Sequence, residues 1–281
     1  MRSPFIILAS LLVCQALSAQ EVADTLRGRV VNAAGTPVEY VSIGIPEQKL
    51  GTISTRDGQF ELVVPRGKAG TVEFHHVSYE TYYLPVSDYA KNLTIALSNQ
   101  ELAPAVAHSG KVRERYLLKR GVAFLGDEAR CVFVPTGKSD RSGELGSAVN
   151  VKHPFRIEEI SLPTVSNSIP ECVISFNVYR VSDHDSVFEN VLTHPIYARV
   201  PVSPSEQVIT VHPGEDIVLE PGRYFFGLQI VDYDRSSYQE EKHGLACKVY
   251  LQSSYFRQTP VEKPIPIPIN VGLSVKGKEY L

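Results

Sequence analysis

Residue types that could carry out chemistry occur in this chain, but their spacing matches no catalytic or metal-binding motif. None of the eight histidines belongs to a His-Glu-x-x-His sequence or a comparable pair. His75 and His76 are neighbours in an extended run, so their side chains point to opposite faces and cannot easily share one ion. The chain lacks a Gly-x-Ser-x-Gly elbow, a phosphate-binding glycine loop and a cysteine in a motif with a histidine. We therefore expect a protein that is not an enzyme and needs no cofactor; an enzyme whose site is assembled from distant loops is the alternative.

Two aspartates are the one candidate for a metal site. Asp232 and Asp234 flank Tyr233 where a predicted strand ends, so their carboxylates can face the same side. Ca²⁺ prefers about six to eight oxygen ligands, and one Asp-x-Asp sequence supplies fewer. Paired acids at the end of a strand more often form turns, which is the interpretation that we favour over calcium.

Three tyrosines near late loops are candidates for binding a carbohydrate: Tyr233, Tyr238 and Tyr255. β-Sandwich modules bind sugars by stacking the ring on a flat aromatic side chain with polar groups beside it. The chain has no tryptophan, which would be the strongest stacking surface. Tyrosines near strand ends are also common at the edges of a core, and both interpretations stay open.

The cysteines allow one bridge and leave one thiol over. After removal of an N-terminal leader that contains Cys14, the chain keeps Cys131, Cys172 and Cys247. Cys172 and Cys247 each share a predicted strand face with apolar residues, so a Cys172–Cys247 disulfide is one candidate in an oxidising compartment. Burial of all three as small apolar side chains is the other interpretation.

The N-terminus has the pattern of a secretory signal peptide over residues 1–19. Phe5–Val13 is apolar, an arginine precedes it, and Ala16–Ala19 supplies small residues for cleavage before Gln20. A rival interpretation makes Cys14 a lipidated cysteine, although valine is a poor residue immediately before one. No later stretch has about 18 consecutive apolar residues. We expect an exported chain without a transmembrane segment after cleavage, in the periplasm, at the outer membrane or outside the cell.

Composition and charge favour an all-β protein of two domains. A chain of 281 residues suggests roughly two domains of about 100–200 residues each. Its 14 tyrosines and 11 phenylalanines accompany 19 glycines and 19 prolines, a combination of strand formers and turn formers. Lysine and arginine number 28 against 31 acidic residues, for a net charge of −3, which does not favour binding to nucleic acid.

Short alternating runs between residues 26 and 102 predict a first sandwich of about seven strands. The clearest run is Gly51–Val64, in which Asp57-Gly58 predicts a tight hairpin turn between two extended segments. After the turn, Phe60, Leu62 and Val64 recur at every second position, which gives a strand with one apolar face.

The first domain contains Gly-Arg-Val-Val, Gly-Thr-Pro-Val and Val-Ser-Ile-Gly-Ile, followed by Gly-Thr-Ile-Ser-Thr-Arg-Asp-Gly-Gln-Phe-Glu-Leu. These motifs give it a resemblance to the carboxypeptidase regulatory-like family of exported Bacteroidetes-type proteins. The resemblance covers residues 26–102, and it departs where Ser78-Tyr79 replaces the usual Gly-Tyr. It implies a transthyretin-like sandwich of seven strands that has no peptidase activity of its own.

A linker over residues 103–129 is expected to contain one short helix, Lys111–Phe124, with a basic face. Residues 130–281 are expected to form a jelly-roll-like β-sandwich, which resembles only uncharacterised domains that follow regulatory-like domains. Within it, Cys131–Val134 and Glu144–Val151 have the pattern of paired strands.

Two further features of the second half concern its sheet edges. Phe155–Leu162 changes phase at Glu158-Glu159, which predicts a β-bulge. A run from Ile265 to Val275 keeps its apolar residues at one parity, and prolines at its start predict an edge strand.

These patterns together predict an exported, non-enzymatic envelope or cell-surface protein that acts as a binding or scaffold module. Its partner would be a protein of the cell envelope or a glycan. The alternative function is glycan capture by the second sandwich.

Overall fold

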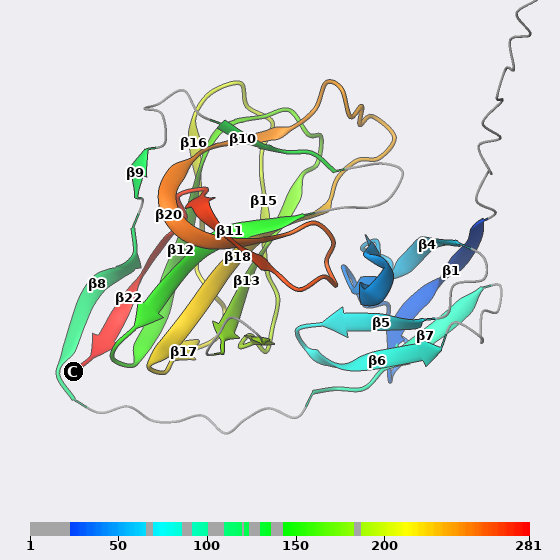
Figure 1. The fold of residues 1–281 in the computed structure, drawn as a ribbon, viewed down its shortest axis with the longest axis horizontal. Helices are drawn as coiled ribbons and strands as arrows, with labels where there is room; N and C mark the ends of the chain where they lie inside the picture. Colours follow the sequence, from blue (N-terminus) through cyan, green and yellow to red (C-terminus); the bar gives the residue numbers. More distant parts are fainter. Residues whose placement is uncertain are drawn as a thin grey trace, which may run out of the picture.

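The computed structural model describes residues 23–65, 70–85, 92–100, 110–119, 121–123, 130–135, 143–182 and 187–281. Within these ranges the regular structure is β-strand, apart from one short 3₁₀ turn, η1 (Pro46–Gln48). The strands form two parts that lie side by side (Figure 1). The predicted signal peptide (residues 1–19) and Cys14 lie outside the described residues. No helix in the described ranges is long and apolar enough to cross a membrane.

The N-terminal part consists of two small sheets. One has the strand order β4-β1-β7 and the other β3-β2-β5-β6. The strands are β1 (Ala23–Asn32), β2 (Ser42–Ile45), β3 (Leu50–Ile53), β4 (Gln59–Pro65), β5 (Thr71–His76), β6 (Tyr79–Pro85) and β7 (Leu93–Leu97). β1 pairs with β4 in antiparallel and with β7 in parallel orientation. Alternate residues of these strands, among them Val30, Ile43, Phe60, Phe74 and Ile95, fill one core between the two sheets.

The Asp57-Gly58 turn forms, but it does not join a hairpin. Gly58 N donates to Thr55 O (2.8 Å), and Thr55 N donates to Gln59 O (2.7 Å). β3 nevertheless pairs with β2 and β4 pairs with β1, so the turn carries the chain from one sheet to the other. The expected hairpin was wrong because the turn is hydrogen-bonded to β1, where Val30 N donates to Gly58 O (2.8 Å).

The C-terminal part is a sandwich of two larger sheets. The seven-stranded sheet has the order β10-β19-β12-β22-β8, with β16 and β17 also on β12. The eight-stranded sheet has the order β14-β13-β18-β11-β20-β21, with β15 on β13 and β9 on β20. The strands are β8 (Val112–Leu118), β9 (Val122–Ala123), β10 (Arg130–Phe133), β11 (Glu144–Val151), β12 (Phe155–Asn167), β13 (Val173–Val181), β14 (Phe188–Asn190), β15 (Ile196–Arg199), β16 (Gln207–Val211), β17 (Val218–Leu219), β18 (Gly222–Asp232), β19 (Leu245–Lys248), β20 (Tyr250–Arg257), β21 (Ile265–Asn270) and β22 (Ser274–Tyr280). A single apolar core lies between the sheets.

The predicted helix at Lys111–Phe124 was wrong, because its described residues form β8 and β9. β8 pairs in antiparallel orientation with β22, which brings Leu118 opposite Val275 inside the core. Arg115 Nη1 lies 2.9 Å from Glu279 Oε1, so the basic side chains pair across the strands. Pairing with a strand some 160 residues later overrides the local preference for a helix.

Of the other expectations for strands in the second half, some are confirmed and others are wrong. The bulge is confirmed as a shift in the β12–β22 register between Ile157 and Glu159. Cys131–Val134 and Glu144–Val151 are not partners, since β10 pairs with β19 while β11 pairs with β18 and β20. The final run is not one strand: β21 is an edge strand, and the chain changes sheets at Gly272 (φ +69°) to form β22.

Gly58 should tolerate substitution poorly, because it combines a positive φ with a close backbone contact. Its φ is +72°, and an added Cβ would lie 2.4 Å from Val30 O. We expect Gly58→Ala to lower the free energy of unfolding by about 2 kcal/mol or more, from backbone strain plus the clash. Gly35 is the matched control, because it has φ +78° and no atom within 4 Å of an added Cβ. Equal losses for Gly58→Ala and Gly35→Ala in urea unfolding would contradict the contact with β1.

Candidate functional site

The two parts are joined by a compact apolar cluster. Tyr40 and Ile53 of the N-terminal part pack with Val173, Tyr197 and Val231 of the sandwich. The rings of Tyr40 and Tyr197 meet edge to face with centroids 5.0 Å apart. The Tyr40 hydroxyl donates to Asp232 Oδ2 (2.9 Å). Burial is the main cause that raises the pKa of Tyr40, and the negative charge of Asp232 adds to it, so the hydroxyl keeps its proton and stays a donor. The junction therefore combines apolar packing with a directed hydrogen bond.

Close to this cluster lies a buried network of polar side chains on the eight-stranded sheet. Glu144 is fully buried, and its Oε2 lies 2.6 Å from Arg257 Nε. Arg257 Nη2 donates to the Tyr179 hydroxyl (2.7 Å), which in turn donates to Glu144 Oε1 (3.3 Å). Asn177 Nδ2 also donates to Glu144 Oε1 (2.6 Å). Gly227 leaves room for this carboxylate, because a Cβ there would lie 2.2 Å from Glu144 Oε1.

The network stabilises the junction rather than forming an open site. A cavity of about 30 Å³ lies between it and His75 and His76 of the N-terminal part, enough for about one water molecule. The Glu144 charge lowers the cost of burying the Arg257 guanidinium, whose pKa is raised. A substrate has no room to approach these groups.

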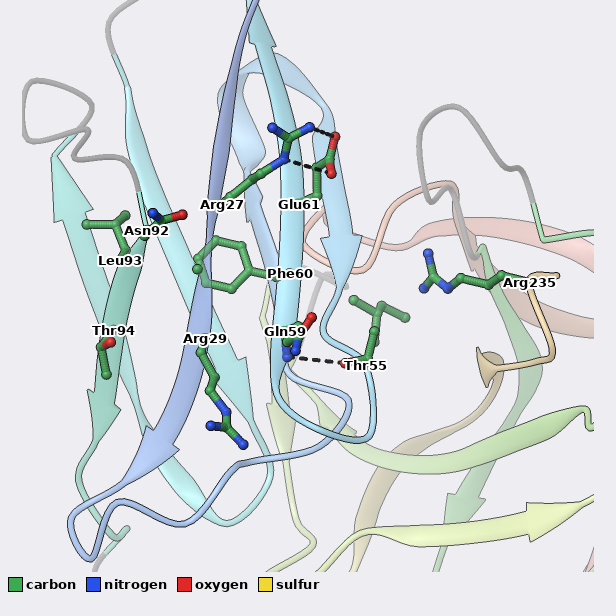
Figure 2. A pocket seen from close by; sticks show the side chains of 12 residues that line it. Arg27, Arg29, Thr55, Gln59, Phe60, Glu61, Asn92, Leu93, Thr94 and Arg235 are labelled. Carbon is green, nitrogen blue, oxygen red and sulfur yellow. Dashed lines mark hydrogen bonds and ion pairs between the residues drawn. The ribbon is translucent and has the colours of Figure 1, made fainter.

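An open hollow of about 550 Å³ lies on the outer face of the β4-β1-β7 sheet. We call it the arginine concavity. Figure 2 shows the side chains that line it, which come from β1, β3, β4 and β7, from the segments just after β3 and just before β7, and from the segment after β18. Its polar and charged lining residues are Arg27, Arg29, Thr55, Gln59, Glu61, Asn92, Thr94 and Arg235. Alternation along β1 explains two of them, because Arg27 and Arg29 face outward while Leu26 and Val30 face the core.

The arginine concavity is lined by more cationic than anionic side chains. Arg27 forms a two-pronged pair with Glu61, with Nε–Oε2 3.0 Å and Nη2–Oε1 2.9 Å, which raises the pKa of Arg27 and lowers that of Glu61. Arg29 Nε donates to Asp57 O (3.1 Å), a contact that leaves its charge unneutralised. Arg235 lies over the Tyr233 ring, 5.4 Å from its centroid, and Figure 2 shows it pointing toward the side of Thr55, in the turn before β4. Three arginines thus line the hollow with one carboxylate.

The two aspartates that were candidates for calcium are engaged in structural contacts. Asp232 accepts from Tyr40 and from Tyr233 N (3.0 Å). Asp234 accepts from Ser236 N (2.9 Å), from Ser236 Oγ (2.6 Å) and from the Ser237 hydroxyl, and these hydrogen bonds lower the pKa of Asp234 to about 2. No group of three or more potential ligands gathers for a metal ion in the described part of the chain. The turn interpretation therefore fits these residues, and the calcium interpretation has no further ligand.

The candidate tyrosines are not a common stacking surface. Tyr255 is fully buried beside Phe188 and Phe225, with centroids 4.9 and 5.4 Å away, so no sugar ring can reach it. Tyr233 and Tyr238 contact each other at 4.8 Å, and both pack against the core. Tyr233 remains relevant only because it supports Arg235.

The three cysteines of the second half have free thiols. Cys172 directly precedes β13 in the eight-stranded sheet, whereas Cys247 belongs to β19 in the seven-stranded sheet. Cys131 lines a second hollow, of about 290 Å³, whose walls are mostly apolar.

The comparisons with known proteins identify the N-terminal part. Residues 26–106 match the sequence model of the CarboxypepD_reg-like domain. This segment is a CarboxypepD_reg-like domain. The match extends the expected boundary of residue 102 by four residues and includes no residue of the C-terminal sandwich. No curated protein matches the chain.

Solved structures with some likeness come from a virus. A structure of the infectious bursal disease virus Gt strain is 10% identical over 92% of this chain, with a TM-score of 0.30. Particles derived from infectious bursal virus give 11% identity over 92% of this chain and a TM-score of 0.26. The chain spans 60% and 62% of those two chains. At these scores the likeness carries no argument about this protein.

Sequence reasoning found neither the arginine concavity nor the buried network. The alternation of Arg27 and Arg29 with core residues in the CarboxypepD_reg-like domain is a signal for an exposed basic stripe. Nothing local to Arg235 indicates that it lies beside that stripe. Glu144 and Arg257 are directly opposite in the β11–β20 register, a pairing that only the fold reveals.

The buried ion pair gives a stability prediction. Arg257→Met should lower the free energy of unfolding by about 3–5 kcal/mol, because Glu144 would stay buried without its cation. Adding Glu144→Gln to this variant should restore most of the loss. Arg27→Met is the control, since its pair with Glu61 is exposed (61% and 53%) and its loss should be too small to measure. A small effect of Arg257→Met in urea unfolding, equal to that of the control, would contradict the network.

The junction histidines give a pH prediction. Burial, with a smaller contribution from the Arg257 charge, lowers the pKa of His75 to about 4. Burial also lowers the pKa of His76 to about 4, with a smaller contribution from His75. Below pH about 6.5 the unfolded chain binds protons that the folded chain does not, so stability should fall as the pH decreases from 6.5 to 4. Urea unfolding at pH 7.5 and pH 5 measures the fall. A His75→Gln, His76→Gln variant should lose less stability over this range, and a loss equal to that of the wild type would contradict the assignment.

Proposed function

We propose that this protein is an exported, non-enzymatic binding module of the cell envelope whose ligand docks in the arginine concavity. The observation that carries the proposal is the positive charge of that open hollow, lined by Arg27, Arg29 and Arg235 with Glu61 as the one carboxylate. The predicted signal peptide supports the compartment. The transthyretin-like and jelly-roll-like descriptions of the two parts belong to the same proposal, and sheets of three and four strands support the first of them.

The lining favours an acidic glycan of the envelope as the ligand. Arginines bind carboxylates through two parallel hydrogen bonds, and amide and hydroxyl side chains beside them suit sugar hydroxyls. Gln59, Asn92 and Thr94 provide such groups along the same sheet. The hollow is open, which suits an extended polymer that lies along the sheet.

The proposal places a carbohydrate ligand in the arginine concavity instead of on the tyrosines of the second sandwich. The tyrosines of the second sandwich are mostly packed against its core, whereas the arginine concavity belongs to both parts. A ligand held by Arg29 and Arg235 together would contact the CarboxypepD_reg-like domain and the sandwich at once. The geometry of the junction would then set the geometry of binding.

Calorimetric titration with an acidic oligogalacturonide tests the proposal. We expect binding that weakens with salt, and a loss of affinity of about tenfold or more in the Arg29→Ala, Arg235→Ala variant. The matched control removes two arginines elsewhere on the sandwich, Arg180→Ala with Arg199→Ala, and should keep the affinity.

Three results would contradict the proposal. Equal binding of a neutral dextran oligosaccharide would remove the role of charge. Equal weakening in the control variant would show a nonspecific charge effect. Preferential binding of an oligoglutamate peptide would indicate an acidic protein partner instead of a glycan.

A further inference from the structure

Strands β10 and β19 bring two cysteines face to face. Cys131 and Cys247 are directly opposite each other in the antiparallel pairing of these strands. Side chains of directly opposed residues lie on the same face of a sheet. Here that face is the core face, because Cys247 is fully buried in the core and Cys131 packs against it.

Directly opposed positions meet the distance requirement of a disulfide. Their Cα atoms are about 4.5 to 5.5 Å apart in antiparallel sheets, and disulfides span Cα separations of about 4.4 to 6.8 Å. The pairing that the sequence suggested, Cys172–Cys247, would have to connect the two sheets. Inter-sheet bridges of this kind occur in other β-sandwiches, but of the other two cysteines only Cys131 is placed directly opposite Cys247 by strand pairing.

We propose that Cys131 and Cys247 form a cross-strand disulfide under oxidising conditions, and that this bond fixes β10 as the wall of the apolar cavity beside it. β10 is an edge strand, paired with β19 alone among the described strands. It contributes Cys131, Val132 and Phe133 to the cavity of about 290 Å³, opposite Leu145 and Ile230. Cys172 stays a buried thiol.

The chemistry is an ordinary thiol–disulfide exchange. The Cys131 thiolate attacks one sulfur of an oxidant of the disulfide class, such as oxidised glutathione, and releases one thiol. The Cys247 thiolate then attacks the Cys131 sulfur and releases the second thiol, so two protons and two electrons leave the protein. Cys131 lines the open cavity and is therefore the entry point for the oxidant. Burial raises the pKa of both thiols, which makes the uncatalysed exchange slow in the folded chain.

Peptide mapping tests the pairing directly. The chain from Gln20 onward, which contains every described residue, is equilibrated in a glutathione buffer at an oxidising ratio during refolding, alkylated and digested with trypsin. We expect peptide 131–138 to be joined to peptide 243–248, and peptide 157–180, which holds Cys172, to be alkylated. The proposal would be overturned if peptides 131–138 and 243–248 were both alkylated. It would also be overturned if peptide 157–180 were joined to peptide 243–248.

Thermal unfolding gives a second measurement that does not depend on the digest. Reductant should lower the midpoint of the wild type by about 5 °C, and that of Cys172→Ala by the same amount. Cys131→Ser should show no effect of reductant. If Cys131→Ser fails to fold, the wild-type peptide map still decides the pairing. An effect of reductant that disappears in Cys172→Ala and persists in Cys131→Ser would contradict the cross-strand bond.

Discussion

The buried ion pair of Glu144 and Arg257 is the constraint on which the arrangement of the two parts depends. A buried carboxylate is tolerated only when its charge is paired and its remaining oxygen lone pairs are satisfied. Tyr179 and Asn177 complete that set, and Gly227 gives the carboxylate its space. The face of the sheet that holds this network is also the face against which the CarboxypepD_reg-like domain packs. The residues that pair the buried charges therefore also lie at the contact between the two parts.

The junction brings side chains of both parts together around one open hollow. Apolar contacts around Tyr40 and the hydrogen bond to Asp232 fix the end of β18 against the CarboxypepD_reg-like domain. The segment that follows β18 carries Arg235, which lines the same hollow as Arg27 and Arg29. The CarboxypepD_reg-like domain supplies most of the arginine concavity, and the C-terminal sandwich completes it.

Local sequence patterns predicted the strands that show a regular alternation of apolar residues. They did not predict which strands pair when the partners lie far apart in the chain. Alternation of apolar residues located the strands of the first domain, and the quoted motifs identified its family. The same local reasoning assigned a helix to the segment of β8, because its basic residues carry no sign of β22 far along the chain. Asp57-Gly58 correctly predicted a turn, but the partners of the strands on either side are set by β1 and β2. Cys131 opposite Cys247 is likewise a matter of register, which spacing does not reveal.

The claim that one ligand site is shared by both parts can be measured at the arginines themselves. Nuclear magnetic resonance resolves the Nε–H groups of arginine side chains, and variants assign those of Arg29 and Arg235. During titration with an acidic oligogalacturonide, the signals of Arg29 and Arg235 should shift together and give the same dissociation constant. A shift of only one of them, or two different constants, would contradict a shared site.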